Sequence, residues 1–104
     1  MTIMSAGDAT QSELAALRAE IDEIDQQIML LLGVRFRCTD MIGELKQASG
    51  LDPADPERAA QQLERIRHLA IDAGVPPDLA ATILRAIIDT VVDHQRQQRE
   101  RPYS

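Results

Sequence analysis

The amino-acid sequence predicts an all-α protein of three helices, of which the first is the longest. Helix-breaking residues gather in only two places, 49–56 and 74–78, and they divide the chain of 104 residues into three segments. Within each segment apolar residues recur every three or four positions, as on one face of a helix. The strict alternation of apolar and polar residues that is typical of strands is absent.

The first helix is predicted from Ser12 to Gln47, with Ser12 as its N-cap. Its apolar residues alternate at spacings of three and four, which is typical of a seam that packs on another helix. The seam consists of Leu14, Leu17, Ile21, Ile24, Ile28, Leu31, Cys38, Ile42 and Leu45. Such a helix would be roughly 50 Å long, more than a domain of this size can cover. We therefore expect a dimer in which two long helices pack together.

The second helix is predicted from Asp55 to Ala73. Asp55 suits the N-cap position, and Pro56 suits the first helical turn. Gly74 suits the C-terminal stop. The loop before this helix, 47–55, contains glycine and polar residues, so we expect it to be mobile and to close over a bound ligand.

The third helix is predicted to begin near Pro77 or Asp78 and to run to about Gln98. The two shorter helices together match the length of the first, so they can fold back along it. The expected organisation is a flexible N-terminal tail over 1–11, a helical domain over 12–98 and a polar C-terminal tail over 99–104.

Composition excludes several classes of function. The net charge is −6 and aromatic residues make up 2% of the chain, which argues against nucleic-acid binding. The single cysteine, Cys38, rules out an internal disulfide, and His68 and His94 lack partners at metal-ligand spacing. No apolar run approaches the roughly 18 residues of a membrane span. We expect a cytoplasmic protein that binds no metal and no membrane.

Two cations interrupt the apolar pattern of the first helix. Arg35 occupies a seam position, where a guanidinium is costly unless an anion meets it. A structural ion pair, or an extended side chain that reaches solvent, would also satisfy it. Lys46 follows eleven residues later, close to three helical turns, so both cations share one face and can converge on a small dianion. Alone, Lys46 would be a solvated charge at a helix end.

Three further polar residues are candidates for the same ligand. Arg18 lies about 25 Å from Arg35 along the helix, so it can reach this ligand only from the partner chain of an antiparallel dimer. Its alternative is a surface pair with Asp22. Gln95 continues the apolar spacing of the third helix and is either a structural hydrogen bonder or a donor to a ligand oxygen. Arg58, in the first turn of the second helix, is either solvated or an anion clamp.

These residues together resemble the all-helical chorismate mutase family, the AroQ class, from about Leu14 to Gln95. Each motif is short and common, and the resemblance rests on their joint order and spacing. The motifs are Leu17-Arg18 followed by Ile21-Asp22 and Ile24-Asp25, then Leu31-Leu32-Gly33-Val34-Arg35, Ile42-Gly43-Glu44-Leu45-Lys46, Asp55-Pro56-Glu57-Arg58, and Ile87-Ile88 with Gln95.

The resemblance implies an intertwined homodimer with two active sites, each completed by the first helix of the partner. It implies the pericyclic rearrangement of chorismate to prephenate, a step of aromatic amino acid biosynthesis in the shikimate pathway, without a cofactor. The implied catalytic residues, Lys46 and Gln95, would face the ether oxygen of the breaking bond. The implied substrate-binding residues are Arg18 of the partner, Arg35 and Arg58 for the two carboxylates, and Asp55 near the hydroxyl.

The sequence also departs from the family pattern. Ala59 stands where many members have a glutamate that binds the ring hydroxyl, and Val91 stands where a small polar residue is often found. The run from Pro56 to Ala60 resembles isochorismate-pyruvate lyases, which share the fold and form salicylate and pyruvate. A related branch rearranges 4-amino-4-deoxychorismate. The alternative to these enzymatic functions is a non-catalytic helical dimer of the same fold.

Overall fold

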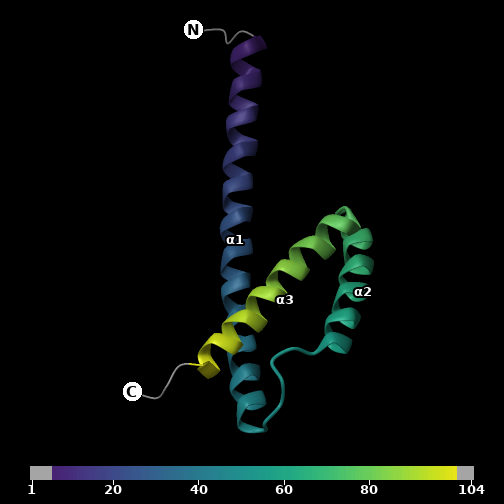
Figure 1. Ribbon diagram of the computed structural model, residues 1–104. Coiled ribbons are helices and arrows are strands. Elements are labelled where there is room, and N and C mark those ends of the chain that lie inside the picture. Colours follow the sequence, from purple (N-terminus) through teal and green to yellow (C-terminus); the bar gives the residue numbers. More distant parts are fainter. Residues whose placement is uncertain (1–5, 101–104) are drawn as a thin grey trace. The chain divides into compact units, whose positions relative to one another are not determined.

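The computed structural model describes residues 6–100, which form three α-helices and, within that range, no strand (Figure 1). The helices are α1 (Ala6–Ala48), α2 (Pro56–Ala73) and α3 (Pro77–Glu100). The prediction of an all-α fold with one long N-terminal helix is confirmed. The outer parts of the two predicted tails, 1–5 and 101–104, lie outside the described residues. The chain divides into two compact units, one up to Arg37 and one from Cys38 onward.

Helix α1 begins six residues before the predicted start, so the prediction of Ser12 as its N-cap is wrong. The segment from Ala6 to Ser12 contains no proline, so nothing in it stops the helix from extending. Asp8 lies in the first turn, where a carboxylate interacts favourably with the helix dipole. The Thr10 hydroxyl donates to the Ala6 carbonyl at 2.9 Å. With 43 residues, α1 is roughly 65 Å long.

The N-terminal unit leaves the seam of α1 exposed. Leu17 is 57% exposed and Leu31 is 69% exposed, and the four other apolar seam residues of this unit are at least 37% exposed. Met29 and Leu30, beside the seam, are more than 60% exposed as well. A continuous exposed apolar stripe of this kind is typical of an interaction surface. It is the stripe from which the sequence predicts a dimer.

The end of α1 is closed by backbone hydrogen bonds. Ser49 N donates to the Leu45 carbonyl at 3.1 Å, and Leu51 N donates to the Lys46 carbonyl at 2.8 Å. Gly50 between them has a φ of 69°, a left-handed conformation that residues with a Cβ adopt only at a cost. The chain therefore leaves the helix through a defined turn directly after Ala48, two residues beyond Lys46.

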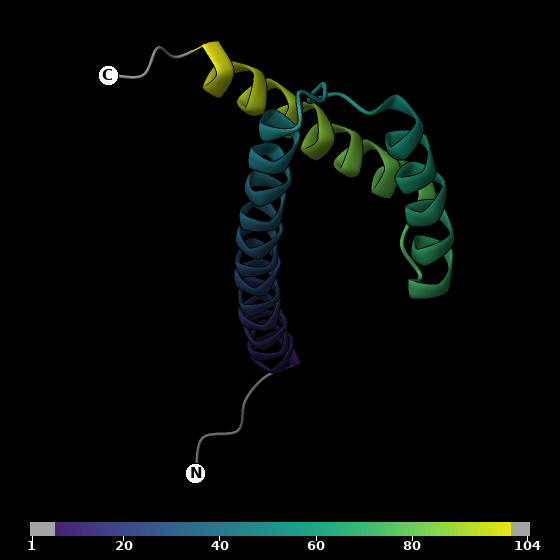
Figure 2. The ribbon, with the colours of Figure 1, turned by 90° about the horizontal axis from the view of Figure 1, so that it is seen from below.

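Both ends of α2 form as the sequence predicts. The Asp55 carboxylate accepts a hydrogen bond from Arg58 N at 3.1 Å, so Asp55 is the N-cap, and Pro56 begins the helix. Gly74 adopts a φ of 75° and ends the helix, with Val75 N donating to the Ala70 carbonyl at 2.8 Å. A short turn then leads into α3 (Figure 2).

Helices α2 and α3 pack against each other over a small interior. Its buried hydrophobic residues are Ala59, Ala70, Ala81 and Leu84. An ion pair between Arg67 and Asp78, at 2.5 Å, joins the two helices near their connecting turn. Helix α3 runs to Glu100, two residues beyond the predicted end. No helix within residues 6–100 is both long enough and apolar enough to cross a membrane.

Candidate functional site

Lys46 lies in the last turn of α1 and is half-buried. Its ammonium donates to the Pro53 carbonyl at 3.1 Å, and Pro53 is itself buried. A lysine ammonium has three N–H donors, so this bond leaves two for other acceptors. The contact holds the cation beside the loop that connects α1 to α2.

Gln95 is the one buried polar side chain among residues 6–100, with 5% of its surface exposed. Its Nε2 donates to the Thr39 carbonyl of α1 at 3.0 Å, across 56 positions of sequence. Its Oε1 is buried and accepts no hydrogen bond from the described residues. A buried acceptor without a partner costs about 1–3 kcal/mol, so a ligand or a water molecule that donates to Oε1 would be favourable here.

Lys46 and Gln95 are brought to one face of α1. The Thr39 carbonyl that holds the Gln95 amide precedes Lys46 by seven positions, close to two helical turns. Residues at this spacing lie above one another on the helix surface. The Gln95 amide and the Lys46 ammonium therefore lie on the same side of α1, about two helical turns apart.

The residues on either side of Gln95 each pair with a carboxylate. His94 Nε2 lies 3.8 Å from an Asp40 oxygen of α1, and Arg96 lies 3.9 Å from an Asp52 oxygen in the loop. All four side chains are at least half-exposed, so each pair by itself contributes little to stability. Both pairs join the stretch of α3 around Gln95 to the end of α1 or to the loop that follows it.

Asp55 and Arg58 lie together at the start of α2. The Asp55 carboxylate is exposed and is engaged in capping the helix through Arg58 N. The Arg58 side chain is exposed in the first turn. A guanidinium there adds its charge to the positive end of the helix dipole, an arrangement that suits a carboxylate or phosphate ligand.

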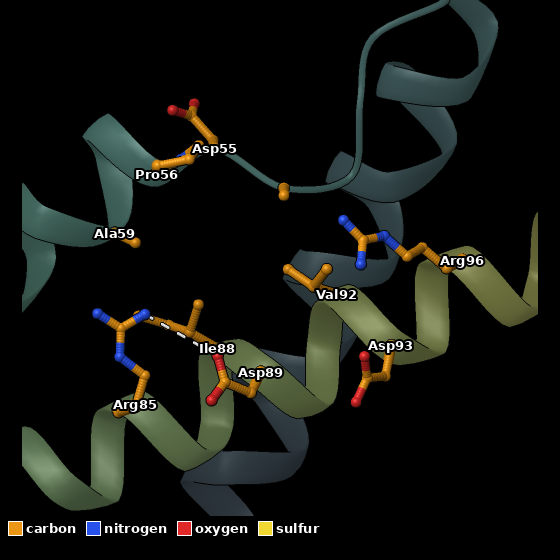
Figure 3. Close-up of a pocket in the computed structure, with 10 residues that line it drawn as sticks. Asp55, Pro56, Ala59, Arg85, Ile88, Asp89, Val92, Asp93 and Arg96 are labelled. Carbon is orange, nitrogen blue, oxygen red and sulfur yellow. Dashed lines mark ion pairs between the residues drawn. The ribbon is translucent and has the colours of Figure 1, made fainter.

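A cavity of about 420 Å³ lies between the start of α2 and the middle of α3 (Figure 3). Asp55 and Ala59 line it from the α2 side, and Ile88 and Val92 contribute apolar surface from α3. The remaining lining residues are Ala54, Pro56, Arg85, Asp89, Asp93 and Arg96. With three carboxylates and two guanidiniums, this cavity is not by itself the cationic pocket that a dianion needs.

The lining of this cavity includes two arginines that the sequence analysis did not single out. Arg85 pairs with Asp89 at 3.9 Å, and in Figure 3 Arg96 lies at the far end of the cavity from Arg85. Their spacing on α3, with Asp89 and Val92 between them, follows the helical period and was the available signal. Neither Lys46 nor Gln95 lines the cavity, so of the six predicted site residues only Asp55 belongs to it.

Arg18 and Arg35 belong to the N-terminal unit. Arg18 is exposed, and Arg35 is half-buried at its seam position. The structure thus distributes the six predicted residues over two units. In the C-terminal unit the Gln95 amide of α3 contacts α1 at Thr39, and Asp55 and Arg58 are adjacent at the start of α2.

Comparison with known proteins shows which family this sequence matches. The model of the family described as chorismate mutase type II matches residues 17–96, which contain all six predicted site residues. The chain is similar to the chorismate mutase of Methanocaldococcus jannaschii, with 32% identity over 88 residues that cover 85% of this chain and 89% of that protein.

Two longer relatives match over part of their length. A T-protein of Enterobacter agglomerans is 40% identical over 77 residues, which cover 74% of this chain and 21% of that protein. A bifunctional chorismate mutase/prephenate dehydratase of Aquifex aeolicus is 35% identical over 88 residues, which cover 82% of this chain and 24% of that protein. The chain therefore spans about a fifth to a quarter of these longer relatives.

Proposed function

Because the chain belongs to the chorismate mutase type II family, we propose that it catalyses the rearrangement of chorismate to prephenate. One observation carries this proposal beyond membership of the family. The buried Gln95 amide is held on the face of α1 that also carries Lys46, in the stretch of chain that the family model matches.

The rearrangement of chorismate requires no covalent bond between the protein and the substrate. One carbon–oxygen bond of chorismate breaks while one carbon–carbon bond forms in the same molecule, and no group leaves. An enzyme must hold the reactive conformer of a flexible dianion. It must also stabilise the negative charge that grows on the ether oxygen as the bond breaks. Hydrogen-bond donors and fixed cations meet both needs without a change of protonation.

Lys46 and Gln95 would supply the donors to the ether oxygen. The Lys46 ammonium has two N–H groups beyond the one on Pro53, and the Gln95 amide has one N–H beyond the one on Thr39. A donor that is withdrawn from water and already fixed needs little reorganisation when charge develops. The burial of Gln95, with 5% of its surface exposed, supports this role.

Arginines would hold the two carboxylates of the substrate. Arg58 and Arg35 would contribute from one chain and Arg18 from the partner, since bidentate guanidinium–carboxylate pairs fix both position and orientation. Asp55 would lie near the substrate hydroxyl while it caps α2. This assignment follows the resemblance of the sequence to the family.

The shared site requires a homodimer, which we propose on the exposed seam of α1. Leu17, Ile21 and Ile24 are each about half-exposed in the single chain, and the other large residues of the seam are exposed as well. A second copy of α1 has the same stripe, and self-complementary surfaces are the usual basis of two-fold dimers.

We further propose a cytoplasmic location, which fractionation of cells tests.

One observation favours a second candidate, an isochorismate-pyruvate lyase. Ala59 is buried, with 8% of its surface exposed, and its methyl group lines the cavity at the start of α2. Many chorismate mutases have a glutamate at this position, whereas the run from Pro56 to Ala60 resembles the lyases. Such an enzyme would use the same cations to expel pyruvate from isochorismate and leave salicylate.

A product assay on the purified protein separates these functions. Chorismate and isochorismate are offered in separate reactions, and the products are identified by chromatography. We expect prephenate from chorismate. Salicylate and pyruvate from isochorismate, with little prephenate, would favour the lyase. If neither substrate gives a product, both proposed activities are overturned, and an amino-substituted substrate or a non-catalytic dimer is favoured.

A further inference from the structure

Gly43 lies under the amide group of Gln95. It is the buried residue of α1, and it sits in the interior of the helix between Thr39 and Lys46. Glycine is among the least favourable residues in a helix interior, so its presence there calls for a local reason. The φ of Gly43 is an ordinary helical one, since only Gly50 and Gly74 have positive values.

The reason is the space that a side chain at this position would fill. A Cβ on Gly43 would lie 2.9 Å from Gln95 Nε2 and 3.0 Å from both Cδ and Cγ of the same side chain. In a helix each Cα–Cβ bond tilts toward the N-terminus, so this Cβ would stand over the carbonyl one turn earlier, that of Thr39. Only a residue without a Cβ leaves the Thr39 carbonyl open to the Gln95 amide from the side.

The same contact fixes which way the amide points. A carbonyl oxygen accepts hydrogen bonds and cannot donate, so the nitrogen of the amide has to face Thr39. One Nε2 hydrogen is used there, and the second remains available at a fixed position. If the amide were flipped, Oε1 would face the Thr39 carbonyl oxygen, and the hydrogen bond between Gln95 and Thr39 would be lost.

We propose that Gly43 is a positioning residue that sets the Gln95 amide for its role in the reaction. This inference rests on the proposed function, in which Gln95 donates to the ether oxygen. Gly43 has no side chain with which to touch the substrate. It acts by leaving a space in which the amide lies against α1, one turn before Lys46.

The test is the Gly43→Ala variant, with Gly33→Ala as the matched control. Both substitutions replace a glycine of α1, but a Cβ at Gly33 would meet only the end of the Arg37 side chain, at 3.9 Å. Alanine is the better helix former at both positions, so Gly33→Ala should unfold at or above the wild-type temperature. In Gly43→Ala the loss of the Gln95–Thr39 hydrogen bond offsets this gain, so its unfolding temperature should stay close to that of the wild type. In Gly43→Ala the contacted atoms belong to a flexible side chain, which moves rather than unfolding the helix.

Steady-state kinetics on chorismate then separate positioning from packing. We expect kcat of Gly43→Ala to fall by about tenfold or more, because a misplaced donor no longer meets the developing charge. KM should stay within about threefold, since the arginines that bind the substrate are unchanged. Gly33→Ala should retain wild-type kinetics.

A double-mutant cycle shows whether Gly43 acts through Gln95. In a Gln95→Ala background the amide is gone, so Gly43→Ala should cause no further loss of kcat. An equal loss in both backgrounds, full activity of the single variant, or a variant that fails to fold would each overturn the proposal.

A structural readout keeps this inference separate from the proposed activity. In the 15N NMR spectrum the Gln95 side-chain amide, assigned by its absence in Gln95→Ala, should exchange slowly in the wild type and quickly in Gly43→Ala. If the wild-type protein rearranges no chorismate, the proposed function fails while this measurement still tests the positioning. Equal exchange in the two proteins would overturn the role of Gly43.

Discussion

Lys46 combines two interactions that mutagenesis can separate. Its ammonium anchors the Pro53 carbonyl and supplies the charge that we propose for the ether oxygen. Lys46→Ala removes both, and Lys46→Gln keeps a hydrogen-bond donor for Pro53 but removes the charge. We expect both variants to lose about a hundred- to a thousandfold in kcat while the helical content measured by circular dichroism is unchanged. Retained turnover in Lys46→Gln would show that the charge is dispensable.

The amide of Gln95 allows a prediction about pH. In Gln95→Glu a carboxylate would face the Thr39 carbonyl and could donate to no acceptor. The ordinary pKa of glutamate, about 4.3, is raised by burial. Protonation restores one donor, so the activity of this variant should rise as the pH falls through that raised pKa, whereas the wild type lacks this dependence. A pH–rate profile checks it, and parallel profiles for the two proteins would contradict the proposed donor role.

The sequence revealed Gln95 but not what holds it. A polar residue at a spacing that is otherwise apolar stands out in the pattern of α3. Its acceptor at Thr39 lies 56 positions away and is a backbone atom, which leaves no trace in residue types. The packing of Gln95 on Gly43 could not be predicted either, because the sequence does not show whether another side chain packs against a glycine in a helix.

At the scale of helices, the cap of α2 can be separated from the charge of Asp55. Asparagine caps helices as well as aspartate does, so Asp55→Asn should keep the bond to Arg58 N and the stability of the protein. Asp55→Ala should lose about 1 kcal/mol of the free energy of unfolding. Chemical denaturation measures both. A loss of turnover in Asp55→Asn without a loss of stability would assign the charge to the site.

The loop between α1 and α2 should respond to a ligand. We predict that amide hydrogen exchange over 49–55 slows when a transition-state mimic of chorismate binds, since Lys46 and Asp55 flank this segment. The turn at 74–76, which ends α2 on its far side, is the internal control and should exchange equally with and without the mimic. Unchanged exchange in the loop would argue against closure.

The helix boundaries show where local chemistry suffices for prediction. Asp55, Pro56 and Gly74 define α2 because each satisfies a specific need of a helix end. The start of α1 was predicted six residues too late because Ser12, a residue that suits a cap, lies inside the helix. A side chain can cap a helix only at the helix end, and here α1 extends through Thr10 and Asp8 before it reaches its first residue, Ala6.

At the scale of the molecule, mixing variants tests whether two chains share a site. Arg18→Ala and Arg35→Ala should each be inactive alone. In a mixed dimer one site receives both wild-type arginines and the other receives neither. Random pairing makes half of the dimers mixed, so about a quarter of the wild-type activity should return. Inactivity despite proven exchange of subunits would rule out the shared site.

The quaternary arrangement is predicted by length and pattern rather than by any single residue. A helix of 43 residues with a long exposed apolar seam is typical of a helix that packs on a partner chain. The identity of the substrate follows from no such rule. An alanine and a glutamate at position 59 differ by only a few atoms at the edge of the cavity, and the product assay decides which substrate this lining favours.

The small interior between α2 and α3 has a consequence for how the protein responds to dilution. Three of its four buried hydrophobic residues are alanines, whose burial stabilises a fold far less than that of leucine or phenylalanine. Most of the apolar surface that could stabilise this chain would be covered only when two chains associate. Folding would then be second order, so that the midpoint of thermal unfolding rises with protein concentration and specific activity falls once the dimer dissociates. The activity per molecule would then rise with the concentration of the protein, because more of the chains would be dimeric.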